Sequence, residues 1–249
     1  MKEFRLDGKK ALVTGAGGGI GKSISQALAG AGAHIFAVAR SEEKLRELKR
    51  EIEAGGGKCD FTPADVTDQG AMEKVVKENG PFRILVNNAG ANRPSLVTDT
   101  EPRDYDAVME LNVKSVYFLA AAVAKDLIAR GLTGSIINVS SQMGHVGGPK
   151  RGVYCASKHA VEGFTKCMAW EWGPHGIRVN SVCPTFVETP MTKPFFEDKE
   201  FMDGVMRSIA LGRIGKPEEV ALPVVFLASE ASSLMTGSAL MIDGGWTAR

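Results

Sequence analysis

Cysteine is scarce in this sequence, and the cysteines present show no functional spacing. The 249 residues include Cys59, Cys155, Cys167 and Cys183, without a Cys-x-x-Cys pair. The four histidines form no His-x-x-x-His pattern either. Because redox and zinc sites usually show such local spacings, we expect reduced thiols in the core and no metal site.

The sequence also lacks an excess of charge of either sign. Lys and Arg total 30 against 29 Asp and Glu, which gives a formal net charge of +1 at pH 7. No block of basic residues follows the pattern needed to track a phosphate backbone. We therefore expect no nucleic-acid partner.

Long hydrophobic runs and linkers are absent as well. The longest apolar stretch, around 116–124, is shorter than the ~20 residues that span a bilayer. Residues 1–7 contain no apolar signal core, and no Pro/Ser-rich or highly charged linker divides the chain. We expect a cytoplasmic protein with no membrane partner and a single domain over residues 1–249.

Short apolar segments alternate with helical patterns along the whole chain. Seven segments have the composition of strands, at 11–13, 34–38, 60–62, 84–86, 136–139, 178–182 and 239–242. Between them we expect helices over 41–54, about 102–130 and 154–172, among others. This alternation predicts an α/β fold with a doubly wound, seven-stranded parallel sheet and helices on both faces.

A glycine-rich turn, Thr14 to Gly21, connects the first predicted strand to a helix. Glycines allow the backbone to approach a pyrophosphate, and a helix amino terminus offers free N–H groups to it. Gly15, Gly19 and Gly21 have this spacing, with Ile20 between the last two. The strand-turn-helix context predicts a nucleotide-binding loop.

Tyr154 and Lys158 lie four residues apart in a predicted helix and so share one of its faces. An unperturbed phenol ionises near pH ~10, and a neighbouring cation lowers that pKa. Ser141 follows a predicted buried strand, so its hydroxyl should emerge at the carboxyl end, where open α/β sheets bind ligands. Tyr154 is therefore a candidate general acid/base.

Taken together, these motifs resemble the short-chain dehydrogenase/reductase family along essentially the whole chain. The resemblance implies a Rossmann-type fold, a homotetramer packed through the helices at 102–130 and 154–172, and hydride transfer between nicotinamide C4 and a carbonyl or secondary alcohol. The matching segments are Thr14-Gly15-x-x-x-Gly19-x-Gly21, Asp65, Asn87-Asn88-Ala89-Gly90, Asn112, Ser141, Tyr154-x-x-x-Lys158 and Pro184 with Thr189-Pro190-Met191.

The resemblance also implies roles for individual residues. Lys158 would bind the nicotinamide ribose, and Asn112 would support a water chain to it. The catalytic set is Asn112, Ser141, Tyr154 and Lys158, and the cofactor-binding set is Gly15, Gly19, Ile20, Gly21, Arg40, Asp65, Val66, Asn88, Ala89, Gly90, Tyr154, Lys158, Val187 and Thr189.

Coenzyme preference depends on the end of the second strand. By resemblance, Ala39 occupies the position where an acidic residue would bind the adenosine ribose diol, and Arg40 follows it. A guanidinium there could pair with a 2′-phosphate. NADP(H) is therefore favoured over NAD(H), although residues 16–18 contain no basic side chain.

Substrate identity is less evident from the sequence. Arg93, Gln142 and His145 are candidate pocket residues, which would suit a polyhydroxylated or carboxylated ligand. We interpret Lys150 and Arg151 as solvated loop residues. The segment 186–215, rich in Phe and Met, is predicted to cover the substrate as a lid.

Three hypotheses about function follow. The first is a reductase or dehydrogenase of a small sugar, polyol or sugar acid. The second is a 3-oxoacyl-[acyl-carrier-protein] reductase, in which Lys150 and Arg151 serve an acidic carrier protein. The third is a non-catalytic NAD(P)-binding redox sensor, which would have no need of a proton donor.

Overall fold

Seven strands form one parallel sheet in this computed structural model, which describes residues 1–190 and 192–248. The order β3-β2-β1-β4-β5-β6-β7, with every neighbouring pair parallel, confirms the predicted doubly wound sheet. Each predicted strand falls within an observed one. The strands are β1 (Lys10–Thr14), β2 (His34–Ala39), β3 (Lys58–Pro63), β4 (Ile84–Asn87), β5 (Gly134–Val139), β6 (Ile177–Pro184) and β7 (Ala239–Ile242).

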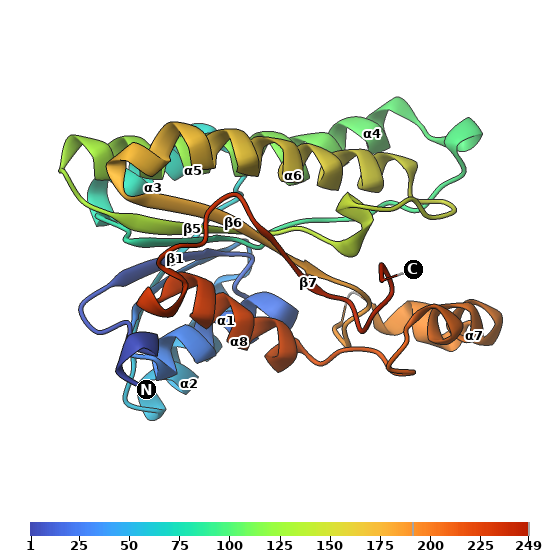
Figure 1. Cartoon of the computed structure of the whole chain (residues 1–249), viewed down its shortest axis with the longest axis horizontal. Helices are drawn as coiled ribbons and strands as arrows, with labels where there is room; N and C mark the ends of the chain where they lie inside the picture. Colours follow the sequence, from blue (N-terminus) through green and yellow to red (C-terminus); the bar gives the residue numbers. More distant parts are fainter. Residues whose placement is uncertain (191, 249) are drawn as a thin grey trace.

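Helices cover both faces of the sheet (Figure 1). One layer contains α1 (Gly19–Gly30), α2 (Glu42–Ala54) and α8 (Pro217–Ala228), and the other contains α3 (Gln69–Asn79), α4 (Pro102–Met109), α5 (Ser115–Ala129) and α6 (Gly152–Trp172). The remaining helix, α7 (Lys199–Ser208), lies beyond this body.

Two hydrophobic cores follow from this layering, because successive strand residues point to opposite faces. In β1, Ala11 and Val13 join the core beneath α1 and α8, whereas Leu12 joins the core beneath α5 and α6. In β4, Val86 joins the core beneath α1 and α8, and Leu85 joins the core beneath α5 and α6. Burial on both sides explains why the strands are continuous apolar runs rather than alternating ones.

Local capping explains where two of the helices begin. The Ser41 hydroxyl accepts a bond from the Lys44 amide at 3.4 Å, and α2 ends before Gly55, as the sequence predicts. The carboxylate of Asp68 accepts from the Ala71 amide at 2.9 Å and starts α3. Side chains at these positions satisfy amides that the helix itself leaves unpaired.

The predicted helix over 102–130 differs from the structure in one respect. Glu110–Lys114 forms a π-helical turn, η3, between α4 and α5, and Asn112 lies within it. The sequence predicted an uninterrupted helix because the π turn contains no glycine or proline to mark the change of hydrogen bonding. Such turns occur mostly within α-helices and frequently at functional sites. The other long helix, α6, starts at Gly152 rather than at residue 154.

The continuous helix Pro102–Ala129 is long and apolar enough to cross a membrane by length and composition alone. Core helices of proteins can have the same length and composition, and 44% of the apolar segment of this helix is buried. Leu119, Val123 and Leu127 of α5 pack into the core against the sheet. In this fold the helix therefore serves as a layer that covers one face of the sheet.

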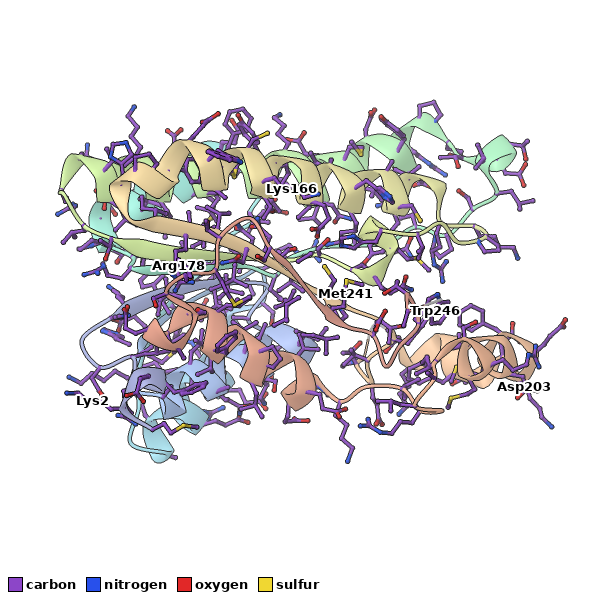
Figure 2. The ribbon with its side chains drawn as sticks, viewed as in Figure 1. Lys2, Lys166, Arg178, Asp203, Met241 and Trp246 are labelled. Atoms are coloured by element: carbon purple, nitrogen blue, oxygen red, sulfur yellow. The ribbon has the colours of Figure 1, made fainter. Side chains whose placement is uncertain are left out.

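The predicted lid, 186–215, contains a short 3-10 turn, η6 (Lys193–Glu197), and α7. Asp203 of α7 lies at the outer end of the molecule, far from the sheet (Figure 2). The ring centroid of Phe186 lies 5.5 Å from that of Phe201 and 6.0 Å from that of Trp246. Three predicted lid positions lie wholly or partly outside the described part of the structure: Met191 and the side chains of Pro194 and Phe195.

Candidate active site

The glycine turn brings two backbone segments closer than any side chain would permit. Gly15 has φ +64°, and a Cβ at Gly21 would lie 2.3 Å from the Gly15 oxygen and 2.4 Å from Asn88 Nδ2. Asn88 Nδ2 donates to the carbonyls of Thr14 and Gly15 at 3.0 and 3.3 Å. This cradle at the start of α1 fits the pyrophosphate of a dinucleotide.

The loop after β6 lies against the same turn. A Cβ at Gly19 would come 3.3 Å from the Thr189 Cβ, so these two predicted coenzyme residues face each other. Val187 is buried and forms a β-bridge with Gly215. The bridge ties this loop to the end of the lid segment, and Ile20 continues from the turn into α1.

Asp65 follows β3 and has a fixed carboxylate. Its Oδ1 accepts bonds from the Thr67 amide at 3.0 Å and from the Thr67 hydroxyl at 2.8 Å. These bonds, with a smaller contribution from the charge of Arg40, hold the pKa of Asp65 below its usual value. The neighbouring Val66 is buried in the core. Arg40 itself is exposed at the end of β2.

A second cation near the end of β2 was not predicted from the sequence. A Cβ at Gly17 would contact Ala39 Cβ and Lys44 Cβ, each at 3.4 Å, so Lys44 lies beside the glycine turn. The sequence signal was the position of Lys44 in the first turn of α2, three residues after the Ser41 cap. This first turn of α2 comes directly after the end of β2, where coenzyme preference is expected to be decided.

The predicted catalytic residues Ser141 and Tyr154 lie close enough for the Ser141 hydroxyl to influence the pKa of the phenol. Ser141 caps the short turn η4 (Gln142–Gly144), where its hydroxyl accepts from the Met143 amide at 3.1 Å. Tyr154 lies in the first turn of α6. The carboxyl end of β5 and the start of α6 therefore meet at these two hydroxyls.

Lys158 is buried one turn further along α6. Its Nζ donates to the Val139 carbonyl at 2.8 Å and lies 5.6 Å from the Tyr154 ring centroid. Burial lowers the pKa of Lys158 to about 8. Burial also raises the pKa of Tyr154, against the opposing effects of the Ser141 bond and the Arg151 charge. The lowering of the Tyr154 pKa expected from the sequence is therefore wrong, because desolvation outweighs the favourable neighbours.

Asn112 is fully buried and joins the same cluster. Its Oδ1 accepts from the Ala91 amide at 2.9 Å, and its Nδ2 donates to the Ala91 carbonyl at 2.9 Å and to Ser157 Oγ at 3.1 Å. A Cβ at Gly90 would lie 3.3 Å from Asn112 Oδ1 and 3.8 Å from Lys158 Nζ. Gly90 therefore leaves the space between the carboxamide and the ammonium open. The preceding Ala89 donates its amide to Thr14 at 3.1 Å.

The three predicted substrate residues lie in different surroundings. The guanidinium of Arg93 is half exposed and forms an ion pair with Asp104 of α4. Gln142 is buried directly after Ser141. The His145 ring lies 3.5 Å from Cys183 Sγ of β6 and 3.6 Å from Glu162 Oε2 of α6.

The interpretation of Arg151 as a solvated loop residue is wrong. Only 7% of Arg151 is exposed, whereas Lys150 is exposed and has a positive φ of 58°. A β-bridge between Ser95 and Arg151 holds this segment against the loop after β4. The contact joins residues far apart in the sequence, and no local pattern indicates it.

Four buried polar atoms lie at the edge of the sheet where this cluster is found. Asn92 Oδ1, Ser140 Oγ, Gln142 Oε1 and Thr185 Oγ1 have no hydrogen-bond partner within residues 1–190 and 192–248. They follow β4, β5 and β6, which are neighbours in the sheet. Because buried polar groups are nearly always bonded, their position indicates a polar ligand at the carboxyl ends of these strands.

Comparison with known proteins gives full-length matches. A family model described as enoyl-(acyl carrier protein) reductase matches residues 15–247. The gluconate 5-dehydrogenase of Gluconobacter oxydans is 39% identical over 98% of this chain and 96% of its own. The 3-oxoacyl-[acyl-carrier-protein] reductase of Thermotoga maritima is 43% identical over 97% of this chain and 99% of its own.

A solved structure agrees with the sequence matches. The gluconate 5-dehydrogenase of Burkholderia cenocepacia, in complex with NADP and tartrate, superposes with a TM-score of 0.94 at 37% identity. The match covers 100% of this chain and 98% of that one. Together with the Rossmann-type sheet and the Ser141, Tyr154 and Lys158 cluster, these matches show that the chain is an NAD(P)-dependent oxidoreductase acting on CH–OH groups and belongs to the short-chain dehydrogenase/reductase family.

Proposed function

We propose that the protein is an NADP(H)-preferring oxidoreductase that interconverts a small polar carbonyl compound and its secondary alcohol. The substrate class is a sugar, polyol or sugar acid. The proximity of the Ser141 and Tyr154 side chains at the carboxyl end of β5, with Lys158 one helical turn away, carries this proposal. Two hydroxyl groups lie at one site, where they can hold a substrate oxygen.

The residues of the cluster divide the proton chemistry between them. The Tyr154 hydroxyl donates its proton to the oxygen of the reacting carbonyl, or removes it in the oxidative direction. Ser141 donates a hydrogen bond to the same oxygen and stabilises the charge that grows on it. Lys158, held through Val139, supplies positive charge near the phenol. Asn112 positions the backbone at Ala91 beside that ammonium.

The coenzyme, when bound, accepts or supplies the hydride at its nicotinamide ring. The cradle formed by Gly15 and Gly21 would hold its pyrophosphate, and Thr189 would approach from the opposite side. Asp65 is ionised and oriented, as a residue that contacts the adenine should be. The described geometry of these residues supports their assignment to the dinucleotide.

The preference for NADP(H) rests on two side chains at the end of β2 and one in the first turn of α2. Ala39 offers no carboxylate to repel a 2′-phosphate, and Arg40 is exposed beside it. Lys44 adds a second cation on the side of the glycine turn. Two cations and no acid favour a phosphate over a free ribose diol.

The substrate class rests on the unpartnered buried polar atoms. Gln142 Oε1 can accept a bond from a substrate hydroxyl next to Ser141, and Asn92 and Thr185 offer further polar atoms at the same edge. A hydrocarbon chain would leave these groups unsatisfied at a cost of about 1–3 kcal/mol each. The Gluconobacter relative is named for a sugar acid, which agrees with this class.

A 3-oxoacyl-[acyl-carrier-protein] reductase remains the second candidate, because the Thermotoga relative bears that name. This candidate was based on Lys150 and Arg151 binding an acidic carrier protein. Arg151 is buried, so of these two residues only Lys150 is exposed at the surface. The redox-sensor hypothesis has no supporting observation, because an intact proton-donor cluster is present. A homotetramer and a cytoplasmic location stay predictions; exposed Tyr117, Phe118 and Trp170 on α5 and α6 support the former.

Initial rates of NADPH and NADH oxidation distinguish these possibilities. The panel should contain sugar-derived ketones, keto acids and 3-oxoacyl thioesters, with Tyr154→Phe as the blank. We expect turnover of a sugar-derived ketone with NADPH that disappears in the blank. Faster turnover of carrier-linked 3-oxoacyl thioesters would instead support the second candidate.

A further inference from the structure

Between α6, β6 and the segment after η4, three side chains of metal-ligating type come together. Glu162 lies on α6, Cys183 lies on β6, and His145 follows η4. Their possible ligand atoms all lie within 4.8 Å of one another. These residues are far apart in the sequence, so the search for local spacings that predicted no metal site could not detect them.

The distances within this cluster fit tetrahedral coordination. Cys183 Sγ lies 3.5 Å from His145 Nε2 and 3.3 Å from Glu162 Oε1, and His145 Nε2 lies 3.6 Å from Glu162 Oε2. A tetrahedral zinc ion with Zn–S of ~2.3 Å and Zn–N or Zn–O of ~2.0–2.1 Å separates its ligand atoms by about 3.3–3.7 Å. The three side chains lie near this spacing, with Cys183 beside one Glu162 oxygen and His145 beside the other, so a bidentate carboxylate or a small rotation of it would complete the ligand set.

The charges of the cluster favour a cation as well. The side chain of Glu162 is only 6% exposed, and its ion-pair partner is His145, which carries charge only when protonated. Ser181 Oγ donates to Glu162 Oε2 at 2.9 Å and so orients the carboxylate. In the metal-free cluster the Cys183 thiol donates a hydrogen bond to Glu162 Oε1 at 3.3 Å, and a divalent cation would replace that proton and compensate the carboxylate and the thiolate together.

We propose that His145, Glu162 and Cys183 form a binding site for a thiophilic divalent cation of the zinc type. Thiolate, imidazole and carboxylate together are ligands that zinc accepts. Binding breaks the S–H bond of Cys183 and forms a metal–sulfur bond, and the proton passes to solvent. The His145 side chain is 31% exposed and provides the route from solvent, where water completes the coordination.

The position of the site connects it to the catalytic cluster. Glu162 lies one turn beyond Lys158 on the same helix face, and a Cβ at Gly144 would lie 3.0 Å from Glu162 Cγ. The η4 turn, which Ser141 caps, therefore packs directly on Glu162. A cation held by His145, Glu162 and Cys183 would bridge η4, α6 and β6 and stabilise their packing.

Metal binding can be measured without any assumption about substrate. The purified, reduced full-length protein is treated with a chelator and titrated with Zn²⁺ against a chromophoric competitor, and with Co²⁺ for its thiolate charge-transfer band. We expect one equivalent of metal per chain, a thiolate–cobalt band, and a melting temperature that rises with Zn²⁺ concentration.

Variants assign the binding to the cluster. Cys183→Ser should remove the cobalt band and, like His145→Ala, weaken Zn²⁺ binding roughly tenfold or more. Cys167→Ser, at an exposed cysteine outside the cluster, should bind as the wild type does. Glu162→Gln retains hydrogen-bonding capacity and should also lose affinity. The proposal is overturned if the wild type takes up no Zn²⁺, or if Cys183→Ser and His145→Ala bind it unchanged.

Discussion

Lys158 Nζ lies 5.6 Å from the ring centroid of Tyr154, one helical turn away, while it donates a hydrogen bond to a strand carbonyl. The ammonium is thus fixed between β5 and the phenol rather than exposed to solvent. Its burial costs solvation free energy whenever it is protonated. This cost makes the stability of the fold depend on pH.

The pH dependence has a definite sign. The pKa of Lys158 is about 8 in the folded chain against 10.5 ordinarily, so between these values the unfolded chain binds more protons. The free energy of unfolding should therefore rise with pH across this window, by at most about 3 kcal/mol. Lys158→Met should lack this rise. Urea unfolding of the wild type and of Lys158→Met from pH 7.5 to 10.5 measures this rise. The same pH dependence of the free energy of unfolding in both proteins would show that burial of Lys158 is not its cause.

Tyr154→Phe should lower kcat on the order of 10²- to 10⁴-fold, because the variant cannot donate a proton to the substrate oxygen. Coenzyme affinity should change little, because the ring remains in place. Steady-state rates and fluorescence titration with NADPH measure the two effects. Tyr105→Phe, at a tyrosine that is 47% exposed, is the matched control and should retain full activity. Surviving turnover in Tyr154→Phe would refute the proton-transfer role.

Arg40→Ala should weaken NADPH binding roughly 10- to 100-fold, the loss expected for a charge-assisted contact to phosphate. NADH binding should change far less, because that coenzyme lacks the 2′-phosphate. Arg50→Ala, at an exposed position further along α2, should alter neither affinity. Equal losses for both coenzymes would show that Arg40 does not read the 2′-phosphate.

Gly21→Ala should lower the free energy of unfolding by at least about 2 kcal/mol, because the new methyl group would collide with the Gly15 backbone as well as with the Asn88 side chain. Gly18→Ala provides the control within the same turn. Its Cβ would have no neighbour within 4 Å, and its backbone is extended, so a change below about 1 kcal/mol is expected. Similar decreases in the free energy of unfolding of the two variants would show that the close approach at Gly21 is not the cause.

Patterns confined to neighbouring residues predicted most of the framework. Apolar runs such as 84–86 indicated strands because both faces of a parallel sheet are buried. The Ser41 cap marked the start of α2 because its hydroxyl bonds to an amide three residues away. The pair Tyr154 and Lys158 was identified from helical spacing together with Ser141 and the glycine-rich turn.

Several features of the site were not predictable in this way. Lys44 approaches the glycine turn from another element, and Arg151 is buried by a loop that follows β4. The raised pKa of Tyr154 reflects the desolvation of its surroundings, whereas its spacing from Lys158 suggested a fall. Each of these depends on which residues distant in the sequence come together.

The sequence by itself determined the order of strands and helices, the glycine turn and the residue types of the proton-transfer cluster, because backbone preference and hydrophobic periodicity act over a few residues. The tertiary structure alone decided which side chains are desolvated and which meet across elements, as His145, Glu162 and Cys183 do. Desolvation and contact between separate elements arise only when the chain packs, and these two effects set the charges and pKa values of the site.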